Sequence, residues 1–420
     1  GSYKNTFTGA SSVDFLEDTT VRGRLIWDVN DALSLDMRAG VSEVSGGAIN
    51  FNAVFALPAF ANDFGLGPTF FADVNEHEFI FANNVPGENK QDTEEFSIKA
   101  DWDRDGVDVS AVFSYSNLEE YLLSDGTSAT FYGYELTSAC QADRATLNNT
   151  PASLGGAGRT DLFGDFFAPF GVFPAGVEFQ GIYGPYTPTA CDGYQYQERN
   201  QSDTSLEIRL TSDDDAKVSW IAGVYAAEIE RQVVVGYGAD TGNGFLRQPY
   251  VSPTGPNPTD LLFDDQFDTS VVAVFGQMEF QLSDDMEVAF AARFDKEDRD
   301  VSNQVPNVQT SGLNINASGP INPAFASNPN GIPDRNASFS QFQPKVTWSW
   351  TASDDVNVYA SWGVGFRSGG FNSIGSEALI DFWYNNNGDG TNPGALVDGN
   401  LLVKDEYNKE VSTSYEVGAK

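Results

Sequence analysis

The chain has 420 residues and carries 60 acidic against 23 basic side chains, which gives a net charge of −37 with one histidine. Because nucleic acids are bound through clustered Lys and Arg, this balance argues against a nucleic-acid partner. No segment approaches the roughly 18 apolar residues that a membrane-spanning helix needs, whereas 13% aromatic residues and 41 glycines favour many strands joined by polar loops.

A repeating unit runs along the chain. It consists of about ten residues of alternating polarity, a short polar turn, a second alternating segment and a long irregular stretch. The turns are rich in Asp, Asn, Ser and Gly, which hairpin turns favour. Hairpins are therefore predicted near residues 20–42, 95–116, 204–227, 269–295 and 338–367, with a last strand at 410–420.

The stretches between the hairpins are long for a compact soluble domain. They cover residues 43–93, 117–203, 228–268, 296–337 and 368–409. Since each follows a return strand, the short turns would lie at one end of the sheet and the long loops at the other. Outer-membrane barrels have this asymmetry, with short periplasmic turns and long extracellular loops. The predicted fold is therefore all-β, a transmembrane antiparallel β-barrel in which residues 1–420 form one partial barrel domain.

The alternation also assigns a face to each side chain. In the segment 356–367 one face would carry Val358, Ala360, Trp362, Val364 and Phe366, and the other Asn357, Ser361 and Arg367. A soluble sandwich alternates too, but the polar faces here carry many basic residues, and at mid-depth on a lipid face each would cost roughly 2–4 kcal/mol. We therefore predict that eight basic residues face the lumen: Arg22, Arg24, Arg38, Lys99, Arg209, Arg293, Lys345 and Arg367.

Tryptophans give a second indication of a membrane. Five of them lie within a few residues of a predicted short turn: Trp27, Trp102, Trp220, Trp348 and Trp350. Aromatic side chains gathered at one end of the strands are typical of an interfacial girdle. The alternative is that they are ordinary core tryptophans of a soluble fold.

The most specific segments resemble the barrel of TonB-dependent outer-membrane receptors. Tyr359–Asn372 (YASWGVGFRSGGFN) is similar to a barrel signature of that family, and Phe275–Phe280 (FGQMEF) to an earlier strand. Further similar segments are Arg293–Asp295, Phe342–Lys345 and Glu410–Lys420. The order and spacing agree, so the resemblance is strong over about residues 269–420 and weaker at 20–42.

The resemblance implies a transporter, with neither enzymatic activity nor a cofactor. It implies energy-coupled uptake of a scarce nutrient, such as a ferric siderophore, haem, cobalamin or an oligosaccharide, across the bacterial outer membrane. The implied partners are outer-membrane lipid, a small-molecule ligand and the inner-membrane TonB complex, which acts through an N-terminal plug. The family's barrel has 22 strands around that plug. About eleven strands are predicted here, so we expect an internal portion of a longer receptor, with the plug and the last strands outside it.

Two other interpretations remain open. A passive outer-membrane porin would have the same strand pattern but no plug domain in its native gene. A secreted carbohydrate-binding β-protein would be soluble without detergent.

Two cysteines, Cys140 and Cys191, lie in one polar, Gly- and Pro-rich region. Since no CxxC motif or neighbouring histidine suggests a metal, a disulfide in an external loop is the preferred interpretation, with free thiols as the alternative.

The same region carries five phenylalanines that are candidates for ligand contact or for packing within the loop: Phe163, Phe166, Phe167, Phe170 and Phe173.

Metal sites find little support. His77 stands between Glu76 and Glu78 and either contacts ferric iron or haem or is a solvated loop residue. The segment 385–390 partly resembles a calcium loop, but Leu396 stands where such a loop has its bidentate Glu. No metal site is therefore predicted.

Overall fold

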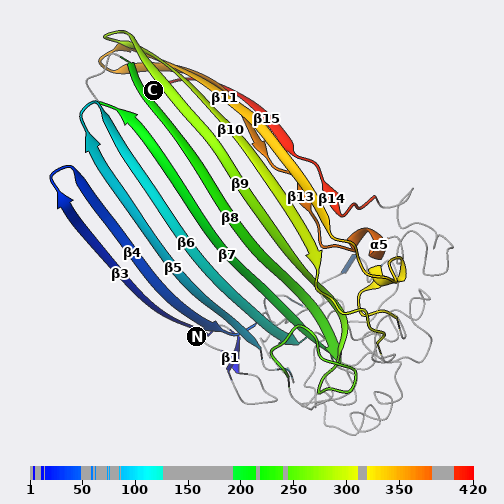
Figure 1. The fold of residues 1–420 in the computed structure, drawn as a ribbon. Coiled ribbons are helices and arrows are strands. Elements are labelled where there is room, and N and C mark those ends of the chain that lie inside the picture. The colour runs from blue at the N-terminus through cyan, green and yellow to red at the C-terminus, as the bar shows by residue number, and fades with distance from the viewer. Residues whose placement is uncertain are drawn as a thin grey trace.

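The computed structural model describes residues 15–48, 87–125, 193–213, 218–239, 245–310, 319–380 and 402–420, and short pieces at 3–4, 11–13, 58–59, 62, 73, 75 and 85. Its main element is a curved antiparallel sheet of 11 strands (Figure 1). The strand order is β15-β12-β11-β10-β9-β8-β7-β6-β5-β4-β3. The sheet is not closed, because β3 and β15 are its two edges, and this confirms the predicted all-β partial barrel.

Eleven long strands make up this sheet: β3 (Leu16–Asn30), β4 (Leu33–Gly46), β5 (Glu88–Arg104), β6 (Val107–Asp125), β7 (Gly193–Ser212), β8 (Val218–Ala239), β9 (Thr259–Ser283), β10 (Met286–Asn303), β11 (Arg335–Ser353), β12 (Val356–Arg367) and β15 (Glu410–Ala419). Two short pairs accompany it: β1 (Tyr3–Lys4) with β2 (Ser11–Val13), and β13 (Gly370–Phe371) with β14 (Glu406–Tyr407). Two short helical elements are also defined among the described residues, η4 (Pro323–Ala326) and α5 (Ser376–Ile380). Among the described residues, no helix has the length and apolarity to cross a bilayer.

The strands meet in short turns at one end of the sheet, here called the turn end (Figure 1). Two residues separate β3 from β4, β5 from β6, β9 from β10 and β11 from β12. In the second of these turns Gly106 has a φ of 85°, a conformation that glycine adopts at no steric cost. The strand ends that the longer connections join lie at the opposite end, here called the loop end.

The strands run further toward the loop end than the sequence predicted, so the predicted loop bounds are too wide. β9 begins at Thr259 and β8 continues to Ala239, which leaves residues 240–258 of the predicted loop 228–268 outside the strands. Likewise β4, β5, β6, β7, β10 and β11 extend into the predicted loops 43–93, 117–203 and 296–337, and the predicted loop 368–409 contains β13, α5 and β14. The reason is that polar and apolar residues are mixed on both faces there. The alternation of polar and apolar residues is therefore lost, while the backbone hydrogen bonds between the strands continue.

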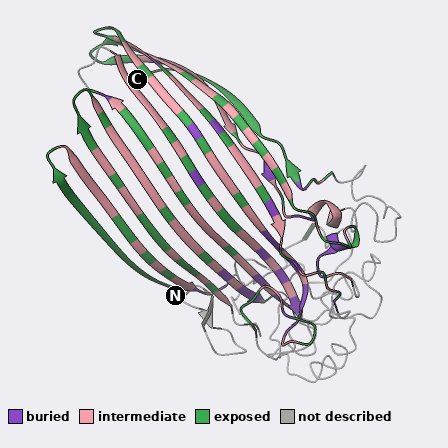
Figure 2. Ribbon diagram, viewed as in Figure 1, coloured by how far each residue is buried: buried purple, intermediate pink, exposed green. Residues whose placement is uncertain are grey.

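Most of the large buried apolar side chains lie at the loop end (Figure 2). This loop-end core consists of Val85, Tyr121, Leu123, Tyr194, Tyr196, Val234, Leu262, Val305, Ile321 and Phe325. The segment 245–258 covers part of it. The Phe245 ring lies 5.2 Å from that of Tyr194, and the Arg247 guanidinium lies 4.5 Å above the Tyr121 ring.

Candidate functional site

The register divides the sheet into two faces, because residues directly opposite each other in an antiparallel ladder share a face. All eight basic residues predicted to face the lumen fall on one face, here called the polar face. The opposite face carries Val358, Ala360, Trp362, Val364 and Phe366 and is here called the apolar face. The register does not itself identify the polar face with a lumen.

Arginines and one carboxylate form a cluster on the polar face near the β3 edge. Arg24 on β3 and Arg38 on β4 are directly opposite each other, and two like charges in that position repel. Asp36 lies between them, with one carboxylate oxygen 2.9 Å from Arg24 Nη2 and 2.8 Å from Arg38 Nη2. The shared carboxylate therefore offsets the repulsion and leaves the cluster with one net positive charge.

Other basic residues of the polar face pair along their own strands. Lys99 Nζ lies 2.8 Å from Asp101, and Arg209 Nη2 lies 2.6 Å from Glu207. In each pair the partner is two residues away, and alternation places it on the same face. The polar face therefore carries ion pairs along several of its strands.

Arg293 is the centre of the most elaborate contact on this face. Its guanidinium donates to both oxygens of Asp295 at 2.7–2.9 Å, and Gln343 Nε2 donates to the same carboxylate at 2.6 Å. The Arg293 guanidinium also lies 5.6 Å from the centre of the Tyr225 ring and 5.7 Å from the centre of the Phe275 ring. The sequence analysis did not single out these two aromatic residues. The one sequence feature that places them on the polar face is that their positions alternate with those of the apolar face.

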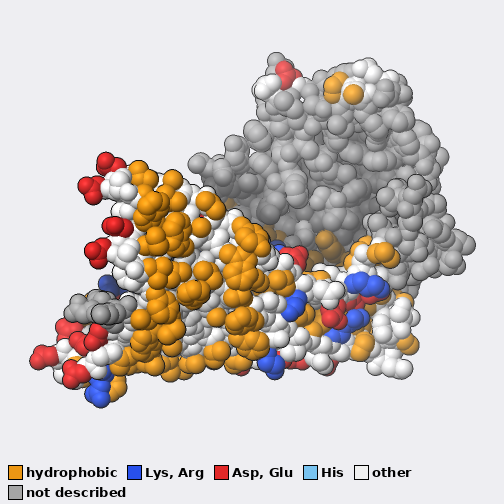
Figure 3. All heavy atoms as spheres, turned by 90° about the horizontal axis from the view of Figure 1, so that it is seen from above, with side chains coloured by type: hydrophobic (Ala, Val, Ile, Leu, Met, Phe, Trp, Pro, Cys, Tyr) orange, Lys and Arg blue, Asp and Glu red, His pale blue; other side chains and the backbone are white. Residues whose placement is uncertain are grey.

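Large hydrophobic side chains are exposed on the apolar face (Figure 3). Val274 is 56% exposed, Phe342 55% and Phe290 50%, and soluble proteins rarely expose large apolar side chains over one extended area. The register also puts on this face, close to the turn end, all five tryptophans of the predicted girdle: Trp27, Trp102, Trp220, Trp348 and Trp350. The arrangement fits a wall with lipid on this side.

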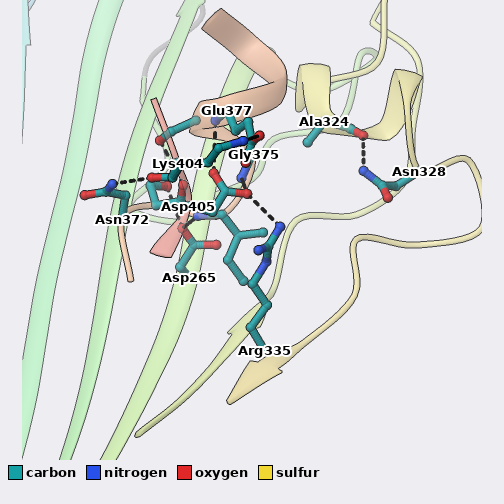
Figure 4. Close-up of polar contacts among 12 residues, drawn as sticks. Asp265, Ala324, Asn328, Arg335, Asn372, Gly375, Glu377, Lys404 and Asp405 are labelled. Atoms are coloured by element: carbon teal, nitrogen blue, oxygen red, sulfur yellow. Dashed lines mark hydrogen bonds and ion pairs between the residues drawn. The ribbon is translucent and has the colours of Figure 1, made fainter. Parts of the chain in front are cut away.

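At the loop end, two buried aspartates hold the connection between β12 and β15 (Figure 4). Asp265, on β9, accepts from the Ser373 hydroxyl at 2.5 Å, from the Ile374 amide at 3.0 Å and from Asn303 Nδ2 at 3.0 Å. Burial raises the pKa of the Asp265 carboxyl, and these donors oppose the rise. The carboxylate thus accepts three hydrogen bonds from two other parts of the chain, residues 373–374 and Asn303 on β10.

Asp405, which precedes β14, is the second of these aspartates. It accepts from Arg335 Nη2 at 3.1 Å, from the Glu377 amide at 3.0 Å and from the Gly375 amide at 3.4 Å. Within the described part of the chain, no group of three or more His, Cys, Asp or Glu is placed to hold a metal ion. The hydrogen-bond donors around both carboxylates indicate an anchor for the backbone.

Tyrosines of the loop-end core lead to a pH prediction. Burial raises the pKa of Tyr121 and of Tyr194 from 10.0 to about 12. The pKa of each phenol is higher in the folded than in the unfolded protein. Its contribution to the free energy of unfolding is therefore fully present below pH 10 and is lost as the pH rises toward 12. A tyrosinate absorbance titration should show a late component that Tyr121→Phe and Tyr194→Phe each reduce. A titration complete near pH 10 in both variants and in the parent would contradict this.

Several predicted residues lie outside the described residues. They are the candidate disulfide Cys140 and Cys191, the candidate ligand contacts Phe163, Phe166, Phe167, Phe170 and Phe173, the loop residue His77 and the segment 385–390. Their roles stay predictions.

Comparison with known proteins identifies relatives of this fold. The family model for the TonB-dependent receptor-like β-barrel matches residues 45–420. The ferric yersiniabactin uptake receptor FyuA from Yersinia pestis is 10% identical with a TM-score of 0.58, over 100% of this chain and 45% of that one. The closed form of the ferric-catecholate import receptor Fiu from E. coli K12 is 10% identical with a TM-score of 0.51, over 96% and 48%.

No curated protein matches the sequence. At such identities the two receptors show the fold alone, and this chain spans less than half the length of either.

Proposed function

The chain belongs to the TonB-dependent receptor-like β-barrel family, and we propose that it forms part of the wall of a transporter in the bacterial outer membrane. The transporter imports a small-molecule nutrient with energy supplied through the TonB complex. Members of this family are outer-membrane transporters, and the proposal gives the same role to the intact protein of which this wall is a part.

The division of the sheet into two faces carries the proposal. Every basic residue of the predicted lumen set falls on the polar face, and large apolar side chains are exposed on the other. In this proposal the polar face lines the lumen and the apolar face contacts lipid. The reverse orientation would bring a row of Arg and Lys into lipid, at roughly 2–4 kcal/mol for each one at mid-depth.

Ferric siderophores are the first candidate for the cargo. The two solved structures compared above are, by their titles, a ferric yersiniabactin uptake receptor and a ferric-catecholate import receptor. A net charge of −37 disfavours free polyanions by simple repulsion and is compatible with an anion whose charge a metal masks. Haem, cobalamin and oligosaccharides are the further substrate classes to compare.

Uptake by cells that produce the intact protein tests this function. The probes are a radioactive ferric catecholate, a ferric hydroxamate, haem, cobalamin and a malto-oligosaccharide, each given to matched cells with and without the TonB complex. We expect one probe to enter only in the cells with TonB. Undiminished entry without TonB would contradict active import and favour a passive porin. A protein that stays soluble without detergent would contradict its placement in the membrane.

A further inference from the structure

Two described limbs of the connection between β12 and β15, residues 368–380 and 402–409, lie together at the loop end. They are called the strap here. β13 pairs with β14, the Asn372 amide donates to the Asp405 carbonyl at 2.8 Å, and Lys404 forms an ion pair with Glu377. The two limbs are therefore fastened to each other.

The strap is also fastened to the polar face. Asp265, Arg299 and Arg335 all stand on that face by register. Asp265 accepts from Ser373 and Ile374, Arg299 Nη2 donates to Ser368 Oγ at 2.6 Å, and Arg335 donates to Asp405. These contacts join residues 69 to 109 positions apart in the sequence, so they fix where the strap crosses the sheet.

Both anchoring carboxylates are almost fully withdrawn from water. Asp265 is 1% exposed and Asp405 4%. A buried carboxylate is stable only while donors surround it, and the strap supplies two donors to Asp265 and two backbone amides to Asp405. Removal of either carboxylate therefore frees strap amides and, at Asp405, leaves the Arg335 guanidinium without its counter-charge.

The segment 245–258, between β8 and β9, lies on the other face. The residues that it approaches, Tyr121, Tyr194 and Gly236, are on the apolar face by register. Tyr194 donates to the Asn257 carbonyl at 2.9 Å, and a Cβ on Gly236 would lie 3.9 Å from the Pro249 carbonyl. This segment therefore folds back over the apolar face at the loop end.

We infer that the two connections are sorted between the faces: the strap crosses the polar face and is held there by Asp265 and Asp405, while the segment 245–258 stands outside. A solute that approaches the polar face from the loop end meets the strap and does not meet that segment. The statement about a solute rests on the proposed function. The anchoring does not.

Two buried valines on opposite faces provide matched reporters. Val301 is 1% exposed on the polar face, between Arg299 and Asn303 on its own strand and opposite Arg335. Val234 is 0% exposed on the apolar face, in the loop-end core. Each is replaced by Cys in the intact protein in outer membranes, in a background with Cys140→Ser and Cys191→Ser. The rate of reaction with a water-soluble maleimide is measured with and without Asp405→Ala.

We expect Asp405→Ala to speed labelling of Val301→Cys by about tenfold or more, because local opening then exposes the polar face. Labelling of Val234→Cys should stay unchanged. Asp405→Asn, which keeps an acceptor oxygen but loses the charge, should give an intermediate rate and guards against misfolding of the Ala variant.

Three outcomes would overturn the inference: no change at Val301→Cys, equal acceleration at both valines, or acceleration at Val234→Cys alone. Since labelling requires no transport, it can succeed while the uptake test fails. In that case only the proposed function is lost.

Discussion

Leu206→Arg is expected to destabilise the folded protein in a lipid bilayer by about 2–4 kcal/mol. Leu206 stands on the apolar face of β7, paired with Phe113 and Ala226, and is 43% exposed without lipid. An Arg at this position would have to leave its charge in hydrocarbon or bend toward the headgroups. The measurement is the denaturant midpoint of the intact protein refolded into phospholipid vesicles, with the loss of free energy taken from the shift.

Ser205→Arg is the matched control, because it adds the same side chain one residue away on the polar face. Ser205 is paired with Ser114 and Ala227, two small residues that leave space for a longer neighbour. We expect a shift of less than about 1 kcal/mol there, which is the usual range for an exposed charge. A larger loss at Ser205 would mean that the lipid and lumen faces are assigned the wrong way round. Equal losses would mean that the two faces meet the same surroundings, which would contradict the assignment as well.

Period-two alternation was enough to predict the sheet and its two faces. It works at a position such as Val358 because side chains of one strand must alternate, and because one face of this sheet is apolar and the other polar. Near Asp268 and Asp300 this division ends, since both faces then carry polar side chains. The strands continue there through backbone hydrogen bonds, which leave no trace in side-chain polarity, and the predicted strand ends were wrong for that reason.

The strap could not be predicted from the sequence. Asp265 is one of 60 acidic residues, and nothing near it in the chain distinguishes it from Asp264, which lies on the opposite face. Its role depends on Ser373 and Ile374, more than a hundred positions away. The same holds for Tyr225 and Phe275 beside Arg293. Such contacts depend on register, and the sequence specifies register only through the whole sheet.

The clearest effect on the polar face is expected for Asp295→Ala. The Asp295 side chain is 7% exposed and accepts hydrogen bonds from both Arg293 and Gln343. Removal of one partner of a fully buried pair costs about 3–5 kcal/mol. Since Arg293 is itself 37% exposed, water offsets part of that loss, and we expect about 2 kcal/mol from the denaturant midpoint in vesicles.

Asp101→Ala is the control for this prediction, because it removes the same group from an exposed pair. Asp101 is 46% exposed and its partner Lys99 47%, so the loss should stay below about 1 kcal/mol. Both carboxylates pair with a base two residues away on the polar face, so the difference between the two variants reports burial together with the Gln343 hydrogen bond. If Asp101→Ala cost as much as Asp295→Ala, the enclosed setting of Arg293 beneath Tyr225 and Phe275 would contribute nothing, and the polar face would behave as an evenly solvated surface.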